Sequence, residues 1–136
     1  MQTVHTRKRP EYRNIHVAQI VRYRMPLAAI ASILHRISGA VMFLLLPFAL
    51  WAFDASLRSP QSYAQLGQVL GWWPVKLVLL GLFWALAHHW TAGVRHLMMD
   101  IFQVVGKEQG RVLAAATFVV SLLATAAFAA HIFWGA

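Results

Sequence analysis

Three long apolar runs, separated by short polar segments, set the pattern of the chain. They cover residues 26–53, 72–99 and 112–134. An α-helix rises about 1.5 Å per residue, so each run is long enough to cross the hydrocarbon core of a bilayer, which is roughly 30 Å thick. The pattern therefore predicts an all-α integral membrane protein with three transmembrane helices.

Two polar segments connect these runs. Residues 54–71 include Arg58-Ser59-Pro60-Gln61, a composition typical of a turn, and predict an exposed connection whose apolar residues lie at the membrane interface. Residues 106–111 predict a short basic turn. The expected organisation is a basic N-terminal segment, residues 1–25, followed by a membrane anchor domain, residues 26–136.

Composition agrees with a membrane location. Of the 136 residues, 60% are hydrophobic and only four are acidic, and a soluble domain of this size could not bury so much apolar surface. The formal net charge is +8, but Lys and Arg gather at the ends of the apolar runs, which disfavours nucleic-acid binding. The chain has no cysteine, which excludes disulfides and thiolate ligation of a metal or iron–sulfur cluster. A redox centre held here must rely on histidine.

The distribution of basic residues predicts the orientation. Six Lys or Arg residues precede the first run, the first connection holds only Arg58, and the second holds Lys107 and Arg111. By the positive-inside rule, the N terminus and the second connection face the cytoplasm. The C terminus then faces the periplasm of a bacterial inner membrane.

The first run carries a polar cluster formed by Ser32, His35 and Arg36. Their spacing of three and four residues places them on one helical face, where a hydroxyl and a guanidinium can donate hydrogen bonds to a carbonyl or a carboxylate. Alternatively, Arg36 extends to the headgroups and Ser32 bonds to its own helix. Spacing alone does not separate a functional role from this structural one.

A second polar cluster lies in the second run. Its members are His88, His89, Arg95, His96 and Asp100. His89 and His96 are seven residues apart and share a face with Gly93, an arrangement suited to a flat cofactor. Since about 10 Å of helix separates these two histidines, they cannot bind the same iron. The alternative is that the histidines form hydrogen bonds between helices or lie at the interface.

The two clusters are expected to meet. The first two helices run antiparallel, so His35 and Arg36, near the start of one, lie at a depth similar to that of the end of the other. This convergence favours a haem and quinone site over a purely structural role.

Two motifs resemble those of a known family. Residues 32–39 (SILHRISG) resemble the S-x-x-H-R-x-[ST]-G motif of the larger cytochrome b anchor subunit of succinate:quinone oxidoreductase. Residues 89–100 (HWTAGVRHLMMD) resemble the H-x-x-x-G-x-R-H-x-x-x-D motif of the same family, and Arg9-Pro10 is similar to its N-terminal opening. The resemblance covers the whole chain in order, although the third run matches only in hydropathy.

The resemblance implies a haem b site shared with a smaller anchor subunit that completes the helical bundle. His89 would be the axial iron ligand of this chain, beside Gly93, while His35, Arg36 and His96 would lie near the propionates. One departure is that His88 precedes the expected ligand. Adjacent helical residues point about 100° apart, so only one faces the haem. The family pattern and the spacing to Gly93 favour His89.

The resemblance also implies a role in quinone reduction. Ser32 and Arg36 would line the ubiquinone pocket, and Asp100 would belong to the proton route. An iron–sulfur subunit and a flavoprotein subunit with FAD would deliver electrons from succinate, so this subunit would perform no carbon chemistry. Two alternatives remain open at this point: the anchor of a fumarate reductase, and a membrane scaffold or small transporter subunit without a cofactor.

Overall fold

The computed structural model describes residues 16–103 and 106–135. The basic segment 1–25 lies largely outside the described residues, as does Arg9-Pro10. Among the described residues every regular element is a helix, in the order α1 (Val17–Arg22), α2 (Leu27–Arg58), α3 (Pro60–Gly71), α4 (Trp73–Ile101) and α5 (Lys107–Trp134).

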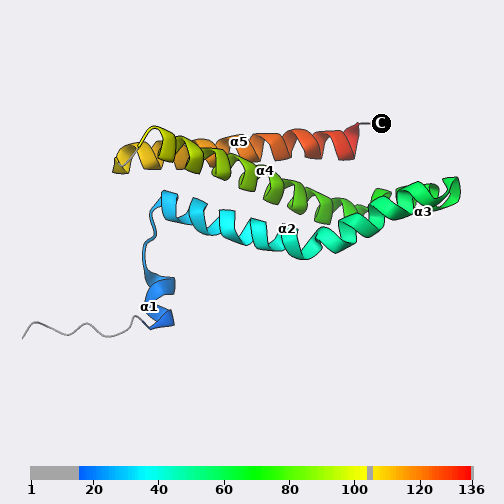
Figure 1. Ribbon diagram of the computed structural model, residues 1–136, viewed down its shortest axis with the longest axis horizontal. Helices are drawn as coiled ribbons and strands as arrows, with labels where there is room; N and C mark the ends of the chain where they lie inside the picture. Colours follow the sequence, from blue (N-terminus) through cyan, green and yellow to red (C-terminus); the bar gives the residue numbers. More distant parts are fainter. Residues whose placement is uncertain (1–15, 104–105, 136) are drawn as a thin grey trace, which may run out of the picture.

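The three long helices pack side by side. Helix α4 contacts both α2 and α5 and runs antiparallel to each, and α2 also contacts α5 (Figure 1). All three are long and apolar enough to cross a membrane, which confirms the predicted fold class. Helix α1 lies apart from this group and packs against none of the other described helices.

The helices extend further into the connections than expected. Helix α2 continues to Arg58 instead of ending near residue 53, because Asp54 pairs with Arg58 one turn later and supports the additional turn. The connection that follows is also helical. Helix α5 begins at Lys107 within the segment predicted as a turn, where Glu108 pairs with Arg111.

A single residue, Ser59, separates α2 from α3. Its backbone is extended, with φ −163° and ψ 160°, and its side chain accepts a hydrogen bond from the Ser62 backbone N–H at 3.1 Å. The Ser62 hydroxyl completes a capping box, and Pro60 occupies the first turn, where its missing N–H has no cost. The predicted turn is therefore a helix restart, and α3 packs back against α2 with no fully buried residue.

Small and polar residues at heptad spacing form the contact between the long helices. They are Ala31 and Ser38 on α2, Ala85, His88, Ala92 and Arg95 on α4, and Gly110, Ala114, Thr117 and Ser121 on α5. Alternating steps of three and four residues place those on α4 and α5 along one stripe of each helix, and their small size lets the backbones approach closely. The Thr117 hydroxyl donates to the Leu113 carbonyl within its own helix at 3.0 Å, so its burial leaves no free donor.

Lys76, near the start of α4, joins that helix to the C-terminal end of α5. Its Nζ donates to the Ile132 carbonyl oxygen at 2.8 Å and lies 5.7 Å from the centre of the Phe133 ring. A cation near the C-terminal end of α5 satisfies a carbonyl there and complements the helix dipole.

Replacing a buried alanine of α5 tests the packing. Ala114→Leu inserts a larger side chain into a fully buried position and should destabilise the helix bundle by about 1–3 kcal/mol, since the core must shift to accept it. Ala126→Leu on the exposed side of the same helix is the control. Thermal unfolding in detergent should show a lower Tm for Ala114→Leu only, and equal values would contradict the packing described here.

Candidate functional site: a histidine cluster between α2 and α4

Three imidazoles meet between α2 and α4. The His35 and His89 rings stack with their centres 4.2 Å apart and their planes 19° from parallel. The His96 ring lies 5.3 Å from that of His35 and is tilted by 50°. All three side chains are half-buried. Helix α2 and helix α4 thus bring together the histidines of both sequence motifs, one from the first and two from the second.

The orientation of His89 is set by α2. Its Nδ1 lies 2.9 Å from the carbonyl oxygen of His35 and 3.3 Å from the Ser38 hydroxyl, which itself donates to the same carbonyl. Because a carbonyl only accepts, we assign the proton of His89 to Nδ1. Nε2 then carries the lone pair, in the tautomer of an imidazole ready to bind a metal.

Gly39 provides the space for this imidazole. A Cβ atom added at Gly39 would lie 2.7 Å from Cε1 of His89, closer than carbon atoms approach each other. By contrast, a Cβ at Gly93 would lie 3.7 Å from Nε2 of His35, an ordinary contact. The closest approach of an imidazole to a glycine is therefore at Gly39 on α2. Gly93 on α4 has no side chain, so the surface of α4 beside His35 stays open.

His88 points elsewhere. Its side chain is fully buried, with Nε2 3.4 Å from the Ala31 carbonyl oxygen. Its ring lies 5.3 Å from that of Trp84 and 5.2 Å from that of Phe118. The neighbouring histidines thus differ in surroundings: His88 is enclosed by α2, α4 and α5, whereas His89 lies at the edge of the α2–α4 pair.

The polar residues of α4 form two stripes and not one cluster. Arg95 is buried and repeats the position of His88 seven residues earlier, while His96 repeats the position of His89. A step of one residue turns about 100° around the helix, which separates each pair. The second polar cluster therefore divides into a buried stripe with His88 and Arg95 and a half-buried stripe with His89 and His96.

The remaining candidates lie around the cluster. Ser32 is half-buried one turn before His35, and Arg36 is exposed beside it on α2. Asp100 is exposed near the end of α4 and forms no ion pair with another described residue. These three side chains are accessible to a neighbouring molecule.

Sequence reasoning missed Ser38 and Gly39 as site residues. Both stand in the first motif, and the only available signal was their position there. Their role depends on which face of α2 approaches the His89 ring, and helical spacing does not determine that.

Comparisons with known proteins agree with these motifs. The family model described as succinate dehydrogenase/fumarate reductase transmembrane subunit matches residues 6–128. A succinate dehydrogenase cytochrome b556 subunit from Coxiella burnetii is 37% identical over 108 residues, covering 77% of this chain and 85% of the relative. Subunits of the same name from Paracoccus denitrificans and Rickettsia typhi are 40% and 29% identical, covering 57% and 58% of this chain and 60% of each relative.

Proposed function

The chain belongs to the succinate dehydrogenase/fumarate reductase transmembrane subunit family, and from this we propose that it binds haem b and helps form the ubiquinone-reduction site of a succinate dehydrogenase. The observation that carries the proposal is the contact of His89 Nδ1 with the His35 carbonyl oxygen at 2.9 Å. It leaves Nε2 available to an iron. The name cytochrome b556 given to the relatives supports a b-type haem.

His89 would hold the haem iron through Nε2. A second nitrogen ligand would come from the smaller membrane anchor subunit, because His96 lies about 10 Å further along the helix and His88 is enclosed within this chain. Gly93 keeps the surface between His89 and His96 free of a side chain, and His35 and His96, with Arg36, provide donors for the propionates. When bound, the haem supplies a one-electron carrier within the membrane.

Ser32 and Arg36 bind the quinone. Both are accessible beside His35 on α2, and their hydroxyl and guanidinium donate hydrogen bonds to a quinone carbonyl. The fixed positive charge of Arg36 stabilises the negative charge that develops on that oxygen during reduction. Asp100 is exposed near the end of α4, where it can pass protons towards the site.

Other subunits supply the electrons. This chain has no cysteine to hold an iron–sulfur cluster, so an iron–sulfur subunit and a flavoprotein subunit with FAD oxidise succinate and deliver electrons to the membrane. The relatives are named succinate dehydrogenase subunits, which favours this direction over fumarate reduction. The excess of Lys and Arg before α2 and around the α4–α5 connection supports an orientation with the N terminus in the cytoplasm and the C terminus in the periplasm.

Substitution of the two adjacent histidines tests the ligand assignment. His89→Leu should abolish or shift the reduced b-type absorbance bands of the purified complex, because it removes the axial nitrogen. His88→Leu should retain them, because His88 contacts Ala31, Trp84 and Phe118 inside the bundle. The opposite pattern would show that His88 is the ligand. The absence of any b-type band from the unmodified complex would favour a scaffold without a cofactor.

Substitution of Gly39 tests how the ligand is positioned. Gly39→Ala should displace the His89 ring and change the haem potential and the electron paramagnetic resonance spectrum, since the added Cβ overlaps Cε1. Gly81→Ala is the matched control, because no atom lies within 4 Å of a Cβ added there. Unchanged haem properties in Gly39→Ala would argue against this orientation of His89.

Substitution of Arg36 tests the quinone site. Arg36→Leu should lower quinone reduction about 10²-fold, the loss typical of removing one preorganised donor, while succinate oxidation with an artificial acceptor continues. Arg58→Leu is the control, because Arg58 lies at the other end of α2 and pairs with Asp54. Normal quinone turnover in Arg36→Leu would reject the assigned role.

A further inference from the structure

A buried guanidinium on α4 has no partner within the described part of the chain. The side chain of Arg95 is 5% exposed, and neither Nε nor Nη1 has a hydrogen-bond partner. An unpaired charge inside a membrane protein has a high free-energy cost. An arginine side chain cannot avoid this cost by deprotonation, because its guanidinium stays protonated in proteins. Arg95 therefore requires an anion.

The three acidic residues that the structure describes do not supply that anion. Asp54 lies at the far end of α2 and pairs with Arg58, and Glu108 pairs with Arg111. Asp100 is exposed five residues after Arg95, about 140° around the same helix. The fourth acidic residue, Glu11, lies outside the described residues. Within the described part of the chain no carboxylate faces Arg95, so we look for its anion in another molecule.

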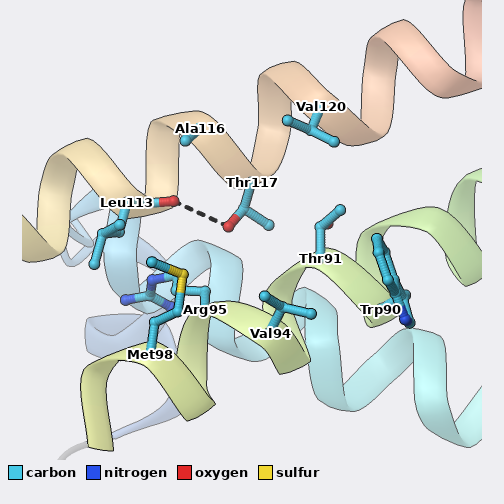
Figure 2. A pocket seen from close by; sticks show the side chains of 9 residues that line it. All are labelled: Trp90, Thr91, Val94, Arg95, Met98, Leu113, Ala116, Thr117 and Val120. Carbon is cyan, nitrogen blue, oxygen red and sulfur yellow. Dashed lines mark hydrogen bonds between the residues drawn. The ribbon is translucent and has the colours of Figure 1, made fainter. Parts of the chain in front are cut away.

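Arg95 lines a groove between α4 and α5. Figure 2 shows its guanidinium beside Met98 and Leu113, at the base of a groove that continues past Val94 to Val120 and Trp90. The groove encloses about 240 Å³, and its walls are almost entirely apolar. Trp90 is 69% exposed at its rim. A ligand for this groove must combine an anionic group with an apolar chain.

The groove is separate from the histidine cluster and lies at a suitable depth. Val94 follows His89 by five residues, which places it about 140° away around α4. Arg95 lies eight residues beyond the middle of α4, about 12 Å along the helix. The hydrocarbon core extends roughly 15 Å from its centre, so the Arg95 backbone lies just inside the core and its long side chain can extend towards the phospholipid phosphates.

We propose that this groove binds an anionic phospholipid, with the phosphodiester on the Arg95 guanidinium and an acyl chain along Trp90, Val94 and Val120. The planar guanidinium suits bidentate binding of a phosphate. A carboxylate from a partner subunit would also neutralise Arg95, but the apolar groove that continues towards Trp90 matches an acyl chain.

The test uses the intact complex, purified in mild detergent and stripped of lipid. Native mass spectrometry measures binding of dioleoyl phosphatidylglycerol and dioleoyl phosphatidylcholine. The unmodified complex should prefer phosphatidylglycerol, and Arg95→Gln should lower its binding about tenfold, the effect of losing one charge-assisted interaction. Binding of phosphatidylcholine and the haem spectrum should not change. Arg111→Gln is the control, because Arg111 is exposed and already paired.

A second variant keeps the test decisive if Arg95→Gln does not assemble. Ala116→Phe fills the exposed wall of the groove and leaves the guanidinium in place, so binding of both lipids should fall. A photo-crosslinking residue at Val94 should label phospholipid. The proposal would be overturned by unchanged phosphatidylglycerol binding in Arg95→Gln. If that variant does not assemble, unchanged binding in Ala116→Phe would have the same meaning. Crosslinking of Val94 to another subunit would also overturn it. Normal lipid binding by an unmodified complex that contains no haem would instead contradict the function proposed for His89 and leave the lipid proposal standing.

Discussion

The hydrogen bond from His89 Nδ1 to the His35 carbonyl oxygen is the interaction on which the site depends. It joins α4 to α2, and it assigns the proton of the imidazole to the nitrogen that faces α2. Both effects require close approach of the two helices, which Gly39 permits. Backbone and side chains thus cooperate: a carbonyl of one span orients the imidazole of the next, so that Nε2 is left for a ligand.

Close packing of the helices in turn depends on small residues, because the hydrophobic effect does not drive apolar helices together within a bilayer. Ala92 and Ala114 are fully buried, while most large apolar side chains of α2, α4 and α5 remain exposed to lipid or to partner subunits. This distribution inverts that of a soluble protein. The interior stripe therefore accommodates polar residues such as His88 and Arg95, provided each finds a hydrogen-bond partner or a counterion.

Sequence alone predicted the three spans and the convergence of His35 with His89, because both follow from apolar length and from antiparallel connection. The helical continuation through residues 54–71 was missed, since Ser59 and Pro60 signal equally a turn and a new helix start. The contact of Gly39 with the His89 ring was also missed. Helical period tells which residues share a face, but the rotation of one helix towards another is decided by side-chain packing along their whole contact.

Helix α4 contains two adjacent pairs of polar residues, His88 with His89 and Arg95 with His96, separated by seven residues. In each pair the first residue is buried inside the bundle and the second lies on the side of α2. The repeat therefore builds two stripes with different requirements. Under the proposed function, a haem and a partner histidine complete the stripe of His89 and His96. The stripe of Arg95 has unpartnered nitrogens within the described part of the chain, and the proposed phospholipid would pair with them. Helix α4 would then be stabilised by other molecules on both of its sides.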